Sequence, residues 1–341
     1  MMKLSFKLLL LLATYGCKHQ VETISSEPSP VCLELAHEDS CQEFHLIPVP
    51  IGVEESTNDL PQSLNPSVNP NNPDEFVYLY APTGGGIPQW TIRKHNSVTH
   101  EDVFMVNSPF PAYIALNWGK AGWISITTAY GKIYLIKEDG SMYHFLMNSG
   151  SVSDSPMDWL NDGKRFLYHR IHSGTEPYFY RIANLAGESL DSIETILSNF
   201  IINENNQIVG LHTVLEDVTY RTNVKIYDLN SKTERNIWQY TPSHYDDKIT
   251  AFAWLPENQH CFFLKDEGLF KLNVSSGVVT QIKQSCNNKH IVSMDVSDNG
   301  KFILYTKRIR RVVSNTEIGW MDEIWKMDFN GCNEERILPQ P

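Results

Sequence analysis

The sequence is short of positive charge and of long apolar runs. Its 341 residues include 40 acidic and 28 basic side chains, so the formal net charge at pH 7 is −12. An acidic surface of this kind does not favour nucleic acid or an anionic bilayer, unless the fold gathers a local basic patch. After the amino terminus, no stretch approaches the ~18 apolar residues that a membrane-spanning helix needs. We therefore expect no nucleic-acid partner, and membrane contact through a lipid anchor only.

Motifs of enzyme active sites are also missing. No Gly-x-Ser-x-Gly elbow occurs, and the cysteines are scattered singly, without the paired spacing of a zinc site. The Gly-Gly-Gly run at residues 84–86 follows a strand without opening a helix, which disfavours a phosphate-binding loop. We expect no cofactor, no metal and no catalytic residue.

What the chain does have begins with an export signal. Residues 1–7 are basic, residues 8–13 are apolar but too few to span a bilayer, and Gly16 precedes Cys17. This order resembles a bacterial lipobox, in which the cysteine is lipidated and becomes the first mature residue. Ordinary cleavage near Gly16 and soluble export is the alternative. The prediction is an exported protein of a bacterium, either periplasmic or anchored as a lipoprotein in the outer membrane.

Six cysteines suit an exported chain. Cys32 and Cys41 are close enough to form a disulfide that closes a local loop. If Cys17 carries lipid, one of the other cysteines stays free. These others are Cys261, Cys286 and Cys332.

Three regions follow from composition. We predict a signal peptide at residues 1–16, then a lipid-attachment cysteine, a polar tether and an extension at residues 17–64. The last part of that extension, residues 53–64, is loop-like. A single domain is predicted at residues 65–341, where a repeat begins.

One short phrase recurs through this domain. Its clearest copies are residues 157–168 (MDWLNDGKRFLY) and 294–305 (MDVSDNGKFILY), each with two apolar strands around a polar turn. Asn and Gly accept positive φ with little strain, so the phrase predicts a tight hairpin. The period is roughly 41 to 52 residues, within the range of propeller blades. Matching strand ends fall at Val68, Trp118, Trp159, Ile202, Trp254 and Val296.

A third strand, a polar turn and a fourth strand follow each hairpin. Four short antiparallel strands repeated six times predict an all-β fold, a six-bladed β-propeller of four-stranded antiparallel blades. One blade cannot cover both of its faces, so the blades must pack on one another around a ring. Most aromatic residues of the strands are therefore expected to pack between blades and not to bind a ligand.

Residues 159–168 resemble the strand-Pro-Asp-Gly-Lys-strand phrase of the TolB-like, WD-related propeller repeats. Residues 323–338 resemble the second half of the same repeat. The resemblance covers about residues 65–338 and is weakest in the fourth copy. The segment before residue 65 is too short for the amino-terminal α/β domain of TolB itself. The resemblance implies a cell-envelope propeller that binds proteins or small ligands, since enzymes are a minority of the family.

The loops between the second and third strands are expected to open at one end of the ring, beside the central funnel. Long loops on a rigid scaffold are where binding surfaces concentrate. The sixth of these loops, residues 307–322, gathers basic side chains on an otherwise acidic chain. The candidate ligand- or partner-binding residues are Lys307, Arg308, Arg310, Arg311 and Trp320, with His172 in the third loop and Tyr220 in the fourth.

Two interpretations of these residues stay open. The arginines suit an anion or a carboxylate, but a run of charge can also continue a solvated strand and pair with acids of neighbouring blades. His169 and His172 would need a third ligand from another blade to hold a metal, so a hydrogen-bonding role is favoured for them.

The sequence thus predicts a non-catalytic interaction propeller of the cell envelope. Its partner would be an envelope protein, a peptide or a glycan, recognised through the long loops. The alternative is a propeller-type lyase or hydrolase whose site gathers side chains from several blades, an arrangement that a linear sequence does not show.

Overall fold

The computed structural model describes residues 54–56 (backbone only), 62–82, 90–107, 114–128, 131–148, 157–170, 179–194, 197–216, 219–242, 249–265, 268–284, 289–314 and 317–339. Its regular elements in these ranges are β-strands. In this part of the chain, no helix has the length and apolar character to cross a membrane.

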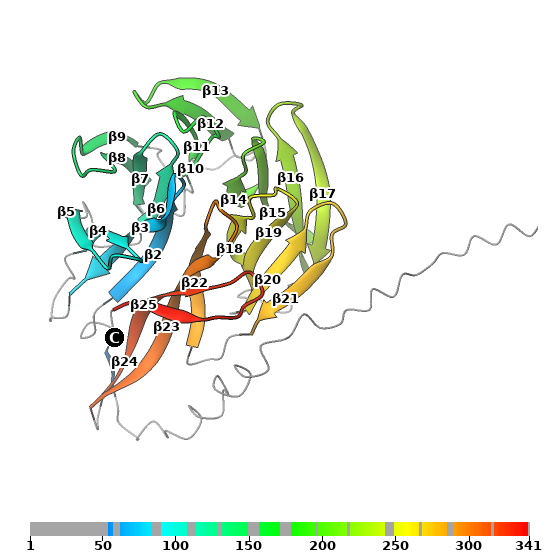
Figure 1. Ribbon diagram of the computed structural model, residues 1–341. Helices are drawn as coiled ribbons and strands as arrows, with labels where there is room; N and C mark the ends of the chain where they lie inside the picture. Colours follow the sequence, from blue (N-terminus) through cyan, green and yellow to red (C-terminus); the bar gives the residue numbers. More distant parts are fainter. Residues whose placement is uncertain are drawn as a thin grey trace, which may run out of the picture.

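Six antiparallel sheets follow one another in sequence order around a central axis, from blade 1 in blue and cyan to blade 6 in orange and red (Figure 1). Each blade has four strands. Blades 1 to 3 comprise β2 (Gln62–Asn69), β3 (Asn72–Ala81), β4 (Thr91–Asn96), β5 (Asp102–Asn107); β6 (Ile114–Gly119), β7 (Trp123–Thr128), β8 (Lys132–Lys137), β9 (His144–Asn148); and β10 (Met157–Trp159), β11 (Arg165–Arg170), β12 (Phe179–Asn184), β13 (Ser189–Glu194).

The second half of the ring repeats this plan. Blades 4 to 6 comprise β14 (Ser198–Ile202), β15 (Gln207–Glu216), β16 (Thr219–Asp228), β17 (Thr233–Tyr240); β18 (Ile249–Trp254), β19 (His260–Lys265), β20 (Gly268–Asn273), β21 (Val279–Lys283); and β22 (Lys289–Val296), β23 (Ile303–Ser314), β24 (Glu317–Met327), β25 (Glu335–Leu338).

The first strand of every blade is the innermost one. Each of these strands contacts the innermost strands of both neighbouring blades, and β2 of blade 1 contacts β22 of blade 6. The ring is therefore closed, and the predicted six-bladed β-propeller of four-stranded antiparallel blades is confirmed.

One apolar cluster fills each of the six spaces between blades. Trp118 packs with Ile92 between blades 1 and 2, Trp159 with Phe166 between blades 2 and 3, and Trp254 between blades 4 and 5. Burying apolar surface on both sides of each sheet supplies the main driving force for closing the ring. The expectation that strand aromatics pack between blades is confirmed for these tryptophans.

The recurring phrase forms the expected hairpin between the first two strands. Met157 pairs with Tyr168 and Trp159 with Phe166, as the phrase predicts. The matching strand ends of the sequence analysis, from Trp118 to Val296, give a common starting point for counting. In blades 2 to 6 the fourth residue after this point has positive φ, because the chain reverses there. These residues are Gly122, Gly163, Asn206, Asn258 and Gly300.

Strand direction gives the ring two different ends. The turns between first and second strands lie at one end, which we call the turn face. The connections between second and third strands lie at the opposite end, which we call the loop face, because adjacent strands in a blade are antiparallel.

On the loop face, the fourth and sixth connections, which were predicted as loops, are in fact extended hairpins. Strands β15 and β16 stay paired as far as Glu216 and Thr219, and β23 and β24 as far as Ser314 and Glu317. The loop assignment was wrong for both, whereas the alternative, in which the charged run of the sixth connection continues a strand, is confirmed. Strand pairing satisfies the backbone groups of charged residues as well as those of apolar ones. The first and third loops, with Gly84–Gly86 and His172, lie outside the described residues.

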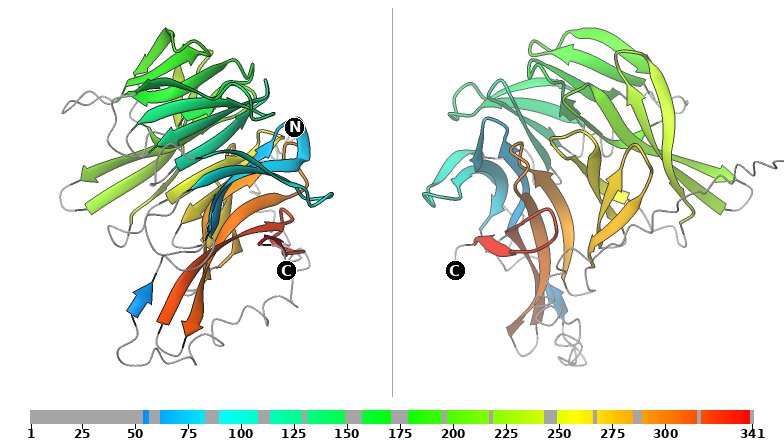
Figure 2. Two further views of the ribbon diagram at one scale, coloured as in Figure 1. Left: turned by 90° about the vertical axis from the view of Figure 1, so that its left-hand side faces the viewer. Right: turned by 45° about the vertical axis from the view of Figure 1, so that its right-hand side comes forward.

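The amino-terminal extension also contributes structure. Strand β1 (Glu54–Ser56) pairs in parallel with Glu317–Gly319 of β24, at the far end of the blade 6 hairpin (Figure 2). Strand β2 begins at Gln62, so the loop-like assignment of residues 53–64 was wrong at both ends. The Gln62 side chain continues this capping, since its Nε2 donates to Trp320 O at 2.8 Å and its Oε1 accepts from Asp322 N at 3.2 Å. A sheet edge is thereby covered, which limits pairing with other chains.

Two of the six cysteines lie in the described residues, and they differ in state. Cys332 is disulfide-bonded, with its partner outside these residues. Cys261 is free and fully buried, and burial raises the pKa of its thiol. Cys17, Cys32, Cys41 and Cys286 lie outside the described residues.

Candidate functional site

A cavity of about 140 Å³ opens at the axis of the ring on the turn face. All six blades line it with the ends of their innermost strands and the turns that follow. The residues that line it all lie in strands and tight turns that the structure describes.

The lining has a simple register when it is counted from the matching strand ends. Two residues after each strand end, every blade contributes one side chain to the rim of the cavity, a set that we call the mouth ring. The mouth ring consists of Pro70, Lys120, Asn161, Glu204, Pro256 and Asp298.

Another set lies one residue before each strand end and deeper along the axis. Four members of this deep ring border the cavity. They are Asn117, Asp158, Ile201 and Asp295.

The mouth ring varies in chemistry because the turn does not constrain it. In blades 2 to 6, the turn is closed by a backbone bond from the fourth residue after the strand end to the first, as from Gly163 N to Leu160 O at 2.8 Å and from Gly300 N to Ser297 O at 2.9 Å. The side chain two positions after the strand end plays no part in that bond. It is free to differ between blades while its backbone is held in place.

Lys120 crosses the mouth of the cavity. Its Nζ donates to the Glu204 carboxylate of blade 4 and approaches Asn161 Oδ1 of blade 3 at 3.4 Å. Asp298 of blade 6 also interacts with both charges. Burial raises the pKa of Asp298, Lys120 opposes that rise, and Glu204 adds to it. The charged members of the mouth ring thus come from alternate blades and act on one another.

Asp158 joins three blades at the bottom of the cavity. Its Oδ2 accepts from Ile202 N of blade 4 at 2.5 Å, and its Oδ1 accepts from Asn117 Nδ2 of blade 2 at 2.9 Å and from Trp159 N at 2.8 Å. Burial raises the pKa of Asp158 to about 7, although these three donors oppose the rise. Both carboxyl oxygens are therefore engaged by the scaffold.

Asp295 repeats this arrangement where the ring closes. Its Oδ2 accepts from Val68 N of blade 1 at 2.8 Å and its Oδ1 from Val296 N at 2.8 Å. Burial raises its pKa to about 7 as well. Ser67 plays the same part between blades 1 and 2, because its Oγ accepts from Trp118 N at 3.0 Å. Side-chain oxygens of the deep ring thus fasten one blade to the next.

Tryptophan side chains make a second kind of joint. Trp159 Nε1 donates to Asn117 O at 3.0 Å, and Trp254 Nε1 donates to Ile201 O at 3.2 Å. The Trp159 ring lies so close to Gly119 that an added Cβ would stand 2.7 Å from it. Trp118 is the exception, since its buried Nε1 has no hydrogen-bond partner among the described residues.

The predicted basic residues lie on the opposite side of the ring, in β23. Lys307 is 5% exposed; its Nζ lies 3.0 Å from Glu334 Oε1 and 4.2 Å from the centre of the Trp325 ring. Arg308 forms a two-bond pair with Asp322, at 2.7 and 2.9 Å. Both basic residues thus pair with acids, as the alternative interpretation expects, but these acids belong to blade 6 itself and not to neighbouring blades.

The other predicted residues do not join them in one cluster. Arg310 and Arg311 pair in register with Trp320 and Gly319, but their side chains lie outside the described ones. Trp320 is half-buried with its ring 5.5 Å from that of His290, and Tyr220 is 42% exposed on a different blade, in β16. Side chains alternate along a strand, so Lys307 and Arg308 belong to opposite faces of β23. Partner binding by these residues stays a prediction.

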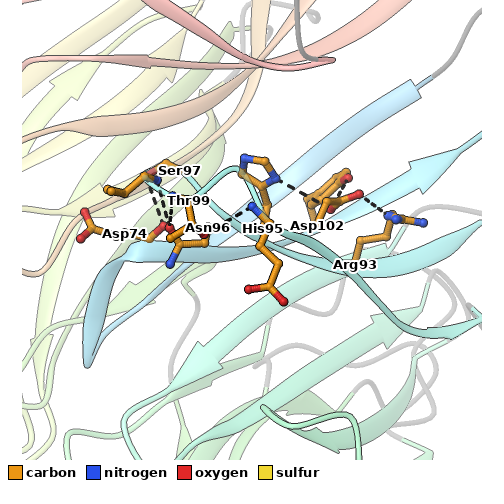
Figure 3. A network of polar contacts seen from close by, with 10 residues as sticks. Asp74, Arg93, His95, Asn96, Ser97, Thr99 and Asp102 are labelled. Carbon is orange, nitrogen blue, oxygen red and sulfur yellow. Dashed lines mark hydrogen bonds and ion pairs between the residues drawn. The ribbon is translucent and has the colours of Figure 1, made fainter.

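Blade 1 contains another polar cluster, away from the axis (Figure 3). Asp102 accepts from Arg93 Nε at 2.7 Å and from Tyr78 OH at 3.0 Å, while His95 Nδ1 lies 3.8 Å away, beyond hydrogen-bond distance. Burial alone would raise the pKa of Asp102, but the nearby His95 ring, the hydrogen bond from Tyr78 and the Arg93 guanidinium outweigh it and hold that pKa below its usual value. Since His95 is fully buried, no substrate can reach it. This cluster ties β3, β4 and β5 of blade 1 together.

A metal site is not apparent in the described part of the chain, where no group of three or more His, Cys, Asp or Glu side chains could hold an ion. His169 is 7% exposed and stacks on Tyr180 with the ring centres 5.0 Å apart, and burial lowers its pKa. A hydrogen-bonding role for His169 stays a prediction. His172, Glu176 and Asp217 lie outside the described residues.

Comparison with known proteins supports the fold. No family model matches the sequence, and no curated protein matches it. A structure described as a TolB from Agrobacterium tumefaciens is similar with a TM-score of 0.54 and 12% identity, over 73% of this chain and 88% of that one. The β-propeller domain of the Trilobed protease from Pyrococcus furiosus, with an open velcro topology, gives 0.53 and 10% over 83% and 97%. The acylaminoacyl peptidase of Pyrococcus horikoshii gives 0.51 and 10% over 84% and 54%.

These likenesses show a β-propeller with distant structural similarity to TolB-like propellers. At such identities they show the fold alone, and the neighbours include peptidases as well as a TolB. The chemistry of the turn face therefore has to be argued from this chain.

Sequence reasoning missed the mouth ring and the deep ring, although the signal was present. Both clear copies of the phrase begin Met-Asp, which places Asp158 and Asp295 inside otherwise apolar inner strands. A charged residue at the same place in two repeats indicates a shared structural task. Reading across the six copies at that position and three residues later would have found both rings.

Proposed function

We propose that this protein is a non-catalytic binding propeller whose partner contacts the mouth ring on the turn face. The observation that carries the proposal is the mouth ring, where one residue per blade surrounds a cavity and the charged members come from different blades. Lys120, Glu204 and Asp298 meet at the axis and offer a partner a charged contact surface.

The size of the cavity limits what enters it. Sites for drug-sized ligands occupy about 300–1,000 Å³, whereas this cavity measures about 140 Å³. It suits one side chain or a small head group. A protein or peptide partner that inserts a single residue, with the surrounding turns as a contact rim, fits this geometry better than a whole free ligand.

Charge reversal at the mouth tests the proposal. We expect Asp298→Lys and Glu204→Lys to abolish capture of a partner by the purified protein in extracts of its own envelope, detected by mass spectrometry. Glu335→Lys is the matched control, because Glu335 is exposed in β25 away from the cavity. Equal capture by all three variants would contradict a partner at the mouth.

A lyase or hydrolase is the second candidate, favoured by the two carboxyl groups of pKa about 7 beside the cavity. The hydrogen bonds from Ile202, Trp159 and Asn117 argue against it, because Asp158 has both oxygens committed to the scaffold. An activity with a pH dependence set near 7, lost in folded Asp158→Asn, would favour the enzyme instead.

We further propose export and lipid attachment at Cys17, supported by the apolar leader and the small residue before the cysteine. Metabolic labelling with a fatty acid should mark the wild-type protein and leave Cys17→Ser unlabelled. Labelling of neither protein would favour soluble export.

A further inference from the structure

We propose that the mouth ring binds a protonated amine or guanidinium group, and that Lys120 occupies this site as a built-in competitor until the ligand displaces it. The inference rests on the proposed function and deepens it, since it names the chemistry of the group that enters the mouth. It is carried by the cavity, by the position of the Lys120 ammonium and by the surplus of carboxylates around it.

The cavity presents more negative than positive charge. Glu204 and Asp298 stand in the mouth ring. Asp158 and Asp295 lie below them and add only part of a negative charge each near neutral pH, because burial raises their pKa to about 7. Lys120 is the only basic residue among the described lining residues. A group that enters the mouth leaves bulk water and meets these carboxylates, so a cation is favoured over an anion.

The structure itself shows that an ammonium group fits there. Lys120 Nζ reaches across blade 3 to the Glu204 carboxylate of blade 4, with Asn161 Oδ1 at 3.4 Å as a further acceptor. A carboxylate oxygen of blade 4 and an amide oxygen of blade 3 thus accept from one cationic nitrogen of blade 2. A lysine or arginine side chain of a partner, or a free polyamine, presents the same chemistry.

Lys120 can leave this position at little cost. Its side chain is 37% exposed and that of Glu204 is 52% exposed, and ion pairs between exposed side chains contribute little stability. The backbone of the turn is held independently, because Asn71 Nδ2 donates to Lys120 O at 2.9 Å. The side chain can therefore swing into solvent without disturbing the turn.

Affinity measurements on lysine variants test the proposal. We would titrate putrescine, spermidine and agmatine into the full chain by calorimetry. In parallel, blocked pentapeptides would be titrated with lysine, arginine or norleucine at the centre. We expect weak binding to wild type and about fivefold tighter binding to Lys120→Met and Lys120→Gln, because the competitor is gone. Lys164→Met is the matched control, since Lys164 is exposed on the turn of blade 3 and does not line the cavity.

Second substitutions localise the gain. Adding Glu204→Gln or Asp298→Asn to Lys120→Met should return the affinity to the wild-type value or below it. Tetramethylammonium, which has no N–H donor, should bind none of the proteins measurably. Tighter binding of the lysine or arginine peptides than of the polyamines would assign the cation to a polypeptide, and the reverse order to a free polyamine.

Failure here is distinguishable from failure of the proposed function. If Lys120→Met binds every cation no more tightly than wild type does, the competitor role is overturned. The partner-capture experiment with Asp298→Lys is then judged separately. If capture is lost in that variant while no cation binds to any protein, the mouth remains the binding site and only its cation chemistry is wrong.

Discussion

The turn face and the loop face belong to the same six blades, yet they vary in different ways. On the turn face, the connections keep nearly one length and one hydrogen-bond pattern, and the residue two positions after the strand end changes its chemistry from blade to blade. On the loop face, the connections vary in length, and two of them are extended hairpins. On the turn face, a fixed backbone carries side chains that differ between blades, as a binding site requires. On the loop face, the differing lengths of the connections change the outline of the ring.

The difference has an energetic basis. A side chain on a turn that backbone bonds hold in place loses little conformational freedom when a ligand binds. Gly119 packs against the Trp159 ring, which belongs to the core between blades 2 and 3. Because Lys120 follows Gly119 directly, this packing fixes the backbone from which the Lys120 side chain extends. Recognition at the mouth thus depends on the packing beneath it.

The largest expected effect separates the two faces by stability. Trp159→Ala removes a ring that packs between blades and a hydrogen bond to Asn117, and we expect a loss of about 3–5 kcal/mol in the free energy of unfolding. Tyr220→Ala, on the loop-face hairpin and 42% exposed, should cost well under ~1 kcal/mol. Urea unfolding followed by circular dichroism measures both. Equal losses would mean that packing between blades at the axis contributes no more to the free energy of unfolding than the loop-face hairpin does.

The pH dependence of stability is the next largest effect. Burial raises the pKa of Asp158 and Asp295 to about 7, so the folded protein holds protons that the unfolded chain releases near pH 4. Since the folded state binds more protons between these values, stability falls as pH rises from about 4 to 7. One pKa unit corresponds to about 1.4 kcal/mol, so each aspartate accounts for a decline of at most about 4 kcal/mol in the free energy of unfolding over this range.

Substitutions assign this decline to the axis. Asp158→Asn and Asp295→Asn together should flatten it, as measured by urea unfolding at several pH values. Asp102 of blade 1 is the contrast, because its folded pKa is lowered. The stability that it contributes is present above about pH 4 and is lost as the pH falls further. Asp102→Asn should therefore leave the decline between pH 4 and 7 intact.

Two glycines with similar backbones sharpen the comparison between the axis and the outer edge. Gly163 has φ +61°, and an added Cβ would lie 2.6 Å from Ala121 N of the neighbouring turn. Gly140 has φ +79°, but its nearest contact would be at 3.9 Å. We expect Gly163→Ala to cost about 2–3 kcal/mol and Gly140→Ala about 1 kcal/mol, from the φ term alone. Thermal unfolding of both variants checks this, and equal costs would exclude the turn-to-turn contact.

Much of the fold could be predicted from the sequence, because one pattern recurs in six copies and each copy supports the same assignment. The hairpin around Gly163, the third strands and the packing of Trp159 all follow from the alternation of apolar residues and from the turn residues. The strand β1 could not be predicted in this way. Its three residues carry no apolar alternation, and its pairing with β24 joins positions more than 260 residues apart.

The candidate site was predictable only in part. Strand ends such as Trp118 and Val296 were aligned correctly, and the mouth ring lies two residues beyond them. Long loops and the basic run at Lys307 were predicted as the binding surface instead, because an unusual local composition can be recognised in a linear sequence. Convergence of Lys120, Glu204 and Asp298 is not visible there, because it depends on ring closure.

Arg308 offers the smallest effect and decides between the faces most directly. Its guanidinium makes two bonds to Asp322, which is 2% exposed, but Arg308 itself is 39% exposed, so solvent screens part of the interaction. We expect Arg308→Ala to lower the free energy of unfolding by about 1 kcal/mol. Arg308→Lys should fall between that variant and wild type, because it keeps the charge and loses the fork. Partner capture should be unchanged in both, in contrast to Asp298→Lys. If Arg308→Ala abolished capture at unchanged stability, the binding surface would belong to the loop face, and the mouth ring would be reduced to a feature of blade packing.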